Sequence, residues 1–123
     1  MAITTQEIES LEQRINSQLA SKNAQFIMTI HFVSDRLNDP RNIPPITIKE
    51  LEDIFEKVIN NHIEDIIVLS DSSSFNIKCS TSHINMPCAV VKDGAQSLHK
   101  NIVVTIMRKK GFKAKKGDVE FIV

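Results

Sequence analysis

The hydrophobic period of the chain changes near Ile66, and this change limits the folds that the sequence can adopt. Before it, apolar residues recur every three or four positions, as on one face of a helix. After it, apolar and polar residues alternate, as in a half-buried strand. Helices followed by short strands predict an α+β fold, with the helices packed on one face of an antiparallel sheet. At 123 residues the chain can bury one core, so we expect a single domain over residues 1–123.

Two helices are expected in the first half of the chain. Residues 4–7 and 47–50 each read as a capping box, in which a Thr hydroxyl accepts from a free backbone N–H and a Glu three positions later reaches back. An apolar stripe follows each box: Ile8, Leu11, Ile15 and Leu19 in the first, and Leu51, Ile54, Phe55, Val58 and Ile59 in the second. These patterns predict helices near residues 5–21 and 47–61.

The segment between the two helices is less regular. Residues 25–30 are short and apolar, which fits either a strand or a helix extension. Pro40, Pro44 and Pro45 then interrupt the chain, because each disfavours helical geometry in the residue before it. We therefore expect a break in regular structure before the second helix.

The second half is expected to supply four or five strands of a sheet built from residues 66–123. Segments with strand character are residues 66–69, 75–79, 84–91, 101–107 and 119–123. Pro87 has no N–H to donate, so its strand is expected to lie at an edge or to carry a bulge.

The charge of the chain is unevenly distributed. The formal net charge is zero, but residues 98–123 hold seven basic and two acidic residues, a charge of +5 that leaves −5 on the rest. The acidic excess includes one helix face that we expect to be solvated, formed by Glu50, Glu52, Asp53 and Glu56. The basic residues follow a strand and surround Phe112: Arg108, Lys109, Lys110, Lys113, Lys115 and Lys116. Such a concentration of positive charge favours binding to a polyanion such as nucleic acid; the plainer alternative is that these lysines only solubilise the chain end.

The composition is that of a globular protein with no membrane role. Hydrophobic residues make up 41% and charged residues 24%, and no apolar run approaches the roughly 18 residues that span a bilayer. The first residues have neither the basic region nor the apolar core of a signal peptide. Cys79 and Cys88 are nine positions apart, without CxxC spacing, so we expect reduced thiols packed as small apolar side chains.

A group of residues suited to phosphate chemistry precedes the second helix. His31, Arg36 and Arg41 lie within eleven residues. Cleavage of RNA needs proton transfer near neutral pH, which histidine provides, and stabilisation of phosphorane charge, which arginine provides. No metal is implied, because the four histidines lack ligand spacing such as HExxH. The structural alternative is that the histidine only packs and that Asp35 pairs with one of the arginines.

These residues belong to a longer pattern that resembles small phage-encoded proteins with a RelE-like nuclease fold. The matching segments are residues 31–32, 35–39, 41–42, 48–51, 84–87 and 105–113, the last reading Thr-Ile-Met-Arg-Lys-Lys-Gly-Phe-Lys. The chain is also similar to the phage mRNA-cleaving nuclease RegB, in which a His and Arg cluster opens a helix before the sheet. The resemblance spans roughly residues 30 to 113.

The resemblance implies an endoribonuclease that cleaves RNA by 2′-hydroxyl transesterification without a metal or other cofactor. Carried over by position, it assigns catalytic roles to His31, Arg36, Arg41 and Arg108, with Lys109 beside them. It implies mRNA as the partner and the host cytoplasm as the location. The lysines of residues 108–116, which we call the basic segment, are expected to bind the nucleic acid: Lys109, Lys110, Lys113, Lys115 and Lys116.

The same resemblance leaves an alternative open. His31 and Arg36 are five positions apart, whereas the RegB-like pattern has four, an offset of about 100° on a regular helix. Either a bulge restores the common face or the pair is not a catalytic unit. Relatives of this fold that have lost activity are retained as binding modules. The second hypothesis is therefore a non-catalytic phage protein that contacts nucleic acid or other phage or host proteins, whether or not it is part of the virion.

Overall fold

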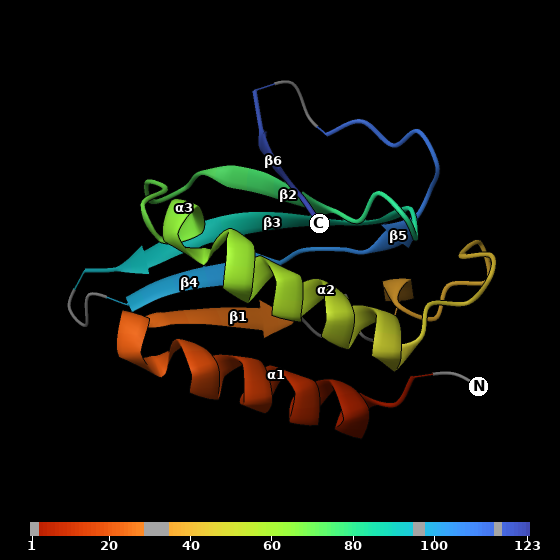
Figure 1. Ribbon diagram of the computed structural model, residues 1–123, viewed down its shortest axis with the longest axis horizontal. Helices are drawn as coiled ribbons and strands as arrows, with labels where there is room; N and C mark the ends of the chain where they lie inside the picture. Colours follow the sequence, from red (N-terminus) through yellow and green to blue (C-terminus); the bar gives the residue numbers. More distant parts are fainter. Residues whose placement is uncertain (1–2, 29–34, 95–97, 115–116) are drawn as a thin grey trace.

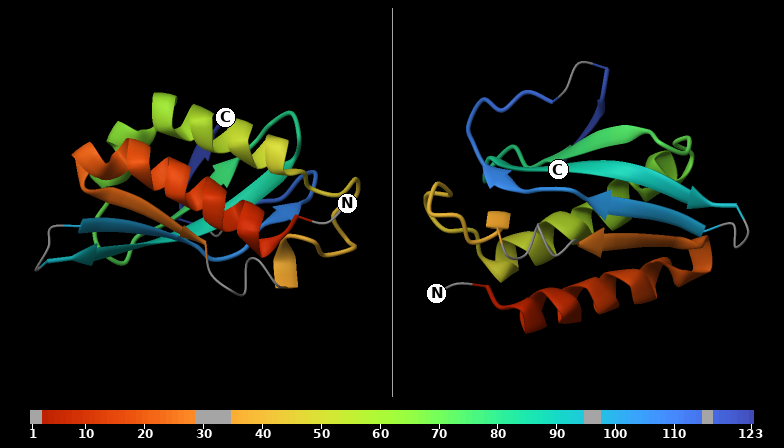
Figure 2. Two further views of the ribbon diagram at one scale, coloured as in Figure 1. Left: turned by 90° about the horizontal axis from the view of Figure 1, so that it is seen from below. Right: turned by 180° about the vertical axis from the view of Figure 1, so that it is seen from behind.

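The computed structural model describes residues 3–28, 35–94, 98–114 and 117–123. Within these ranges, helices α1 and α2 lie across one face of an open sheet of six strands, which contains both parallel and antiparallel pairs (Figure 1). Figure 2 shows the opposite face of the sheet, which neither of these helices covers. The predicted α+β class and the placement of the helices on one face are confirmed.

Helix α1 (Thr5–Leu19) begins at the predicted capping box: Thr4 Oγ1 accepts from the N–H of Glu7, and Glu7 Oε1 accepts from the N–H of Thr4. Its apolar stripe is buried as expected. The short 3₁₀ helix η1 (Ala20–Lys22) follows, and Asn23 adopts a left-handed conformation at φ 52°. Asn tolerates this conformation better than most residues, and it turns the chain into strand β1 (Ala24–Met28).

Helix α2 (Ile48–Asn61) also begins at its predicted capping box and buries Leu51, Ile54, Phe55 and Val58. A second short helix, α3 (Ile63–Ile67), follows after His62. The expectation of strand structure at residues 66–69 is therefore wrong: Ile66 and Ile67 belong to α3, and neither Val68 nor Leu69 lies in a strand. Ile63 and Ile66 are three positions apart and both buried, so this apolar run faces the core with helical spacing.

The remaining strands are β2 (Ser74–Lys78), β3 (Ile84–Asp93), β4 (Leu98–Val103), β5 (Met107–Arg108) and β6 (Val119–Ile122). The order across the sheet is β1-β4-β3-β2-β6, and β5 also pairs with β3. The four predicted strand segments after residue 74 are thus confirmed, although the segment predicted at residues 101–107 contains two strands, β4 and the start of β5.

The expectation of a four- to five-stranded, antiparallel sheet is wrong. The described residues form six strands, and two of their five pairings are parallel: β1 with β4 and β2 with β6. The antiparallel pairings are β2–β3, β3–β4 and β3–β5. Close antiparallel neighbours can be joined by short turns, whereas the parallel partners here are separated by long stretches of chain, as parallel pairing requires.

Pro87 lies in a central strand rather than at an edge. Between the pairs Cys88–Val103 and Asn85–Met107, β3 has two residues and the opposite segment has three, so the ladder carries one extra residue there. The carbonyl of Pro87 accepts from Val104 on this side, and the N and C=O of one residue in a strand point the same way. The missing N–H of Pro87 therefore faces the interruption, which agrees with the predicted bulge.

Side chains of α1 close the outer edge of β1. Asn16 Nδ2 donates to the carbonyl of Phe26 (3.1 Å) and its Oδ1 accepts from the N–H of the same residue (2.8 Å). Glu12 Oε2 accepts from the N–H of Met28 (2.8 Å). An uncovered strand edge would invite pairing with another chain, so these contacts protect the sheet at this side.

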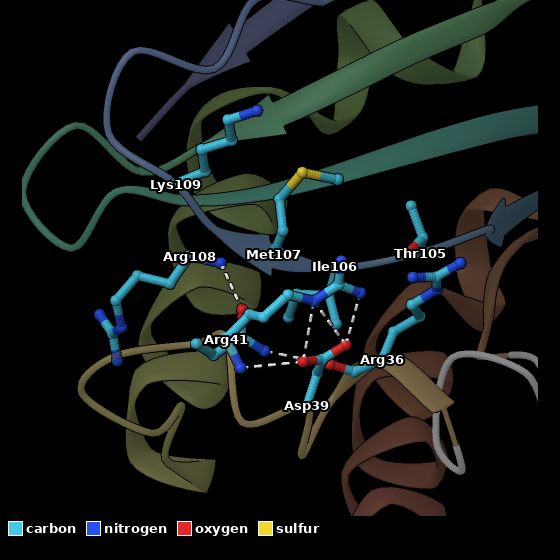
Figure 3. Close-up of a pocket in the computed structure, with 9 residues that line it drawn as sticks. Arg36, Asp39, Arg41, Thr105, Ile106, Met107, Arg108 and Lys109 are labelled. Atoms are coloured by element: carbon cyan, nitrogen blue, oxygen red, sulfur yellow. Dashed lines mark hydrogen bonds and ion pairs between the residues drawn. The ribbon is translucent and has the colours of Figure 1, made fainter.

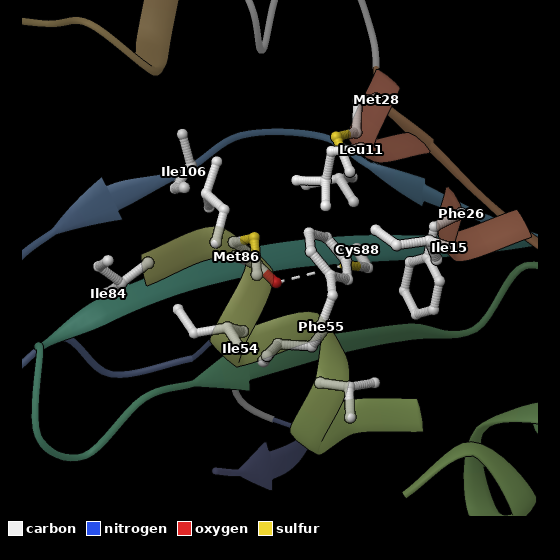
Figure 4. Close-up of a cluster of buried hydrophobic side chains, with 14 of the residues drawn as sticks. Leu11, Ile15, Phe26, Met28, Ile54, Phe55, Ile84, Met86, Cys88 and Ile106 are labelled. Atoms are coloured by element: carbon white, nitrogen blue, oxygen red, sulfur yellow. Dashed lines mark hydrogen bonds between the residues drawn. The ribbon is translucent and has the colours of Figure 1, made fainter. Parts of the chain in front are cut away.

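The core lies between the helices and the sheet (Figure 4). Phe26 of β1 and Phe55 of α2 meet edge to face, with ring centroids 5.3 Å apart. Cys79 and Cys88 are both free and buried, as predicted. Burial raises the pKa of the Cys88 thiol, so this residue packs as an apolar side chain.

The parallel pairing of β1 with β4 positions the candidate site. Because the two strands run in the same direction, Met28 and Val103 lie side by side where both strands end. The loop of residues 35–47 leads into α2, and residues 104–109 contain β5 (Figure 1). These two segments therefore meet at one end of the sheet.

Candidate functional site

A hollow of about 350 Å³ lies between these two segments, and we call it the basic hollow (Figure 3). One wall comes from the loop and contains Arg36, Asp39, Arg41 and Asn42. We call this the loop wall. The other wall, the strand wall, is the continuous segment of residues 105–109, from Thr105 to Lys109. The basic hollow therefore brings together segments that the sequence analysis singled out separately.

An ion pair on the loop wall orients Arg41. Asp39 accepts from Arg41 Nη2 at 2.8 Å, from Nε at 3.1 Å and from the backbone N–H of Arg41 at 2.9 Å. Hydrogen bonding to the Arg41 side chain, above all, lowers the pKa of Asp39 to about 2. The Asp39 side chain is 16% exposed and that of Arg41 is 78% exposed. Asp39 thus fixes one edge of the guanidinium, while Nη1 at the other edge has no partner among the described residues.

Arg36 occupies the other end of the loop wall. Its side chain extends toward Thr105 on the opposite wall, whereas that of Arg41 lies over Asp39 (Figure 3). Arg36 is half-buried, and its charge contributes to lowering the pKa of Asp39. The two predicted arginines therefore line the same hollow.

Asn42 joins the two walls. It is buried, its Nδ2 donates to the carbonyl of Arg36 (3.0 Å), and its Oδ1 accepts from the backbone N–H of Arg108 (2.9 Å). Asn42 and Arg108 are 66 positions apart in the sequence. This side chain sets the spacing between the walls, a role that the sequence pattern alone did not reveal although residue 42 lies in a matching segment.

Arg108 lines the basic hollow, but its guanidinium points away from it (Figure 3). The side chain is 9% exposed. Its Nη atoms pair with the carboxylate of Glu50, and its remaining donors reach the carbonyls of Pro44, Pro45 and Ser82. This environment gives Arg108 a structural function, which does not support the catalytic role assigned to it from the sequence.

The same contact corrects the interpretation of Glu50. This residue was expected on a solvated acidic face, yet its side chain is only 29% exposed and receives two bonds from Arg108. Hydrogen bonding to Arg108 is the main cause that lowers the Glu50 pKa. Sequence spacing gave no signal of the pair, because the partners are 58 positions apart.

The basic segment continues from the strand wall into the solvent. Lys109, Lys110 and Lys113 lie on the surface. The carbonyl of Lys109 accepts from Asn85 Nδ2 (3.4 Å), and its backbone N–H donates to the carbonyl of His83 (2.9 Å), so the start of the segment is attached to β3. These three lysines extend the positive charge of the strand wall beyond the basic hollow.

Three predicted site residues lie outside the described residues, namely His31, Lys115 and Lys116. The relation of His31 to Arg36, on which the two sequence hypotheses differ, stays a prediction. Two other histidines have structural surroundings: His62 contacts the carbonyl of Ile122, and His99 is buried beside Asn101.

Within the part of the chain that the structure describes, no three His, Cys, Asp or Glu side chains are grouped to hold a metal ion. No helix there has the length and apolar character needed to cross a membrane. Comparisons with protein-family models, with curated proteins and with solved structures found no match. The chemistry of the site must therefore be argued from its own geometry.

That geometry suits an anion with several oxygen atoms. Arg36 and Arg41 contribute positive charge from the loop, whereas the side chain of Lys109 extends away from them at the rim (Figure 3). Asp39 is the only carboxylate among the described residues that line the basic hollow. A guanidinium held at one edge and open at the other can donate hydrogen bonds to a phosphate. The basic hollow is thus a candidate phosphate site with a pre-oriented arginine.

Proposed function

We propose that this protein is a metal-independent endoribonuclease of the RelE- and RegB-like type, which binds the RNA backbone in the basic hollow. One observation carries the proposal. Residues 36–42 and 105–109, which belong to segments that match the family pattern, supply the two walls of a single hollow. The two segments are more than 60 positions apart in the sequence, and their convergence in one hollow supports the proposal.

In this proposal Arg36 and Arg41 hold the phosphate and stabilise the charge of the phosphorane, and Lys109 attracts the neighbouring part of the RNA backbone. The 2′-oxygen attacks phosphorus while His31 accepts its proton, and the bond from phosphorus to the 5′-oxygen breaks. The leaving 5′-oxygen takes up a proton from solvent water, and His31 returns to the solvent the proton that it accepted. The products are a 2′,3′-cyclic phosphate and a 5′-hydroxyl, so no water is consumed and no metal is needed to activate one.

A second candidate is a non-catalytic protein that binds RNA at the same surface. The observation that favours it is the pairing of two predicted catalytic arginines: Arg108 is engaged by Glu50 and by three carbonyls, and Arg41 by Asp39. The donors of Arg108 are engaged within the fold and are therefore not directed at a phosphate, which suits a rigid binding surface better than a catalytic site.

The test is incubation of the purified protein with labelled single-stranded RNA in EDTA, with His31→Ala in parallel. The nuclease proposal expects cleavage that EDTA does not inhibit and that the substitution reduces by about 10²–10⁴. A suitable control is His62→Gln, because His62 lies at the opposite end of α2 from Glu50. If the protein binds RNA but cleaves none, free or ribosome-bound, the nuclease proposal is wrong and the non-catalytic binding protein is supported.

A further inference from the structure

A second hollow adjoins the basic hollow on the other side of the same loop, and we call it the proline hollow. Its volume is about 280 Å³, and it shares Asp39 and Asn42 with the basic hollow. The rest of its lining comes from the same turn: Leu37, Asn38, Pro40, Ile43 and Pro45. A ligand bound in the basic hollow therefore lies next to it.

The proline hollow exposes more apolar than polar surface, and its polar side chains are already bonded. Asn38 Oδ1 accepts from the N–H of Ile3 (3.0 Å) and its Nδ2 donates to the carbonyl of Ile3 (2.8 Å). Asp39 is engaged by Arg41, and Asn42 by Arg36 and Arg108. The exposed apolar side chains of its lining are Pro40, Ile43 and Pro45.

Ile43 is the most exposed of the large hydrophobic residues among those described, at 78%. The turn that presents it is fixed from several sides. Arg108 donates to the carbonyls of Pro44 and Pro45, and the neighbouring Ile46 is buried in the core. A large apolar side chain thus stands in water on a rigid base, beside a candidate phosphate site.

We propose that the proline hollow receives an unpaired nucleobase, next to the phosphate held in the basic hollow. This inference rests on the proposed function. A nucleobase has a flat apolar face that aliphatic side chains can cover, and it is covalently linked to the phosphate that the neighbouring cations attract. A base within a duplex is stacked and paired, so the ligand is single-stranded. Since the polar side chains of the proline hollow are all engaged, it accepts any base, as in other sequence-tolerant sites.

The test compares two labelled strands of equal length that cannot be cut through a 2′-hydroxyl. One is a short single-stranded 2′-deoxy oligonucleotide of mixed sequence, and the other is the same backbone without bases. Ile43→Ala is expected to weaken binding of the base-bearing strand roughly fivefold, because less apolar area is buried, and to leave the base-free strand unchanged. Ile43→Phe is expected to tighten binding of the base-bearing strand only, because aromatic rings stack bases.

The matched control is Val68→Ala, since Val68 is 74% exposed and lies at the end of α3. It should change neither affinity. The inference is overturned if Ile43→Ala leaves both affinities unchanged, which would assign the proline hollow to another ligand such as a protein side chain. It is also overturned if both strands weaken equally, which would show that Ile43 acts only through the loop.

Two further variants separate this inference from the proposed function. Arg41→Ala and Lys109→Ala should weaken both strands, because both contain phosphates. If they do so and Ile43→Ala has no effect, only the base site is wrong. If none of the three changes binding of either strand, the phosphate site and the base site are both wrong.

Discussion

Arg108 and Glu50 form a two-pronged ion pair, with Nη2–Oε1 at 2.7 Å and Nη1–Oε2 at 3.0 Å, that joins strand β5 to the first turn of helix α2. Glu50 also completes the capping box with Thr47, whose backbone N–H donates to it at 3.0 Å. One carboxylate therefore fixes the start of a helix and the strand wall of the basic hollow at the same time.

Removal of this pair should destabilise the fold. Arg108→Ala removes the charged partner of Glu50 and the donor to three carbonyls, so we expect the free energy of unfolding to fall by about 3 kcal/mol. Urea denaturation measures this change. Arg14→Ala removes an exposed pair with Glu52 and should cost no more than about 1 kcal/mol. If Arg108→Ala were equally mild while RNA cleavage disappeared, Arg108 would be catalytic rather than structural.

Asn42 should control both stability and binding, because it connects the walls of the basic hollow. Asn42→Ala leaves the N–H of Arg108 and the carbonyl of Arg36 without this partner, and we expect stability to fall by about 1–3 kcal/mol. RNA affinity, measured by fluorescence anisotropy well below the unfolding temperature, should also fall as the walls separate. Unchanged affinity in a folded variant would show that the spacing of the walls does not matter for binding.

The basic segment should determine the salt dependence of RNA binding. Neutralising Lys109, Lys110, Lys113 and Lys115 together should weaken binding at any sequence and reduce the log–log salt slope by roughly 0.7 for each phosphate that the protein no longer touches. Neutralising Lys49 and Lys57, which lie on the surface of α2, is the control. A slope that stays the same would mean that the basic segment faces another partner.

His99 should make the protein less stable at mildly acidic pH. Its ring is buried, and burial is the main cause that lowers its pKa below the ordinary 6.5; nearby Lys92 acts in the same direction, and Asn101 opposes them. Because protonation is less favourable in the folded state, stability is full above pH 6.5 and falls as the pH drops toward the folded-state pKa. Urea midpoints between about pH 7.5 and 5 measure this, with a slope of at most about 1.4 kcal/mol per pH unit.

His99→Gln should reduce the dependence of stability on pH. His83→Asn is the control and should leave this dependence unchanged, because His83 is not buried. Asn also tolerates the left-handed backbone of this residue, at φ 62°. This pH window lies above the range in which most carboxylates titrate, so the effect of His99 can be separated from the effect of the carboxylates. A wild-type protein equally stable at both ends of the window would contradict the prediction.

Local sequence signals predicted the helices and most strands well. The capping boxes at residues 4–7 and 47–50 act through neighbours a few positions away, so their sequence suffices to identify them. The alternation at residues 75–79 likewise indicated a strand, which the structure contains. Residues 66–69 failed because a run of four apolar residues fits a short helix as well as a strand, and only the packing of Ile66 decides.

Pairing and site geometry depend on contacts between distant residues, which a single sequence does not reveal. The parallel register of Phe26 with Asn101 is one such contact, and the ion pair of Arg108 with Glu50 is another. The basic residues themselves could be recognised as a cluster, because their charge is visible in the sequence. Only the structure shows that Arg36 and Arg41 face the basic hollow and that Arg108 instead joins β5 to α2.

Cleavage, if the nuclease proposal holds, should proceed through the 2′-hydroxyl. A single 2′-deoxy substitution at the cut site should abolish cleavage and leave binding almost unchanged, because the phosphate contacts persist. The products should carry a 2′,3′-cyclic phosphate and a 5′-hydroxyl, which mass spectrometry identifies. Arg36→Lys should lower the rate, since a point charge cannot reproduce a two-pronged contact with phosphate. A 3′-hydroxyl product, or full activity without both His31 and Arg36, would place the reaction at another site.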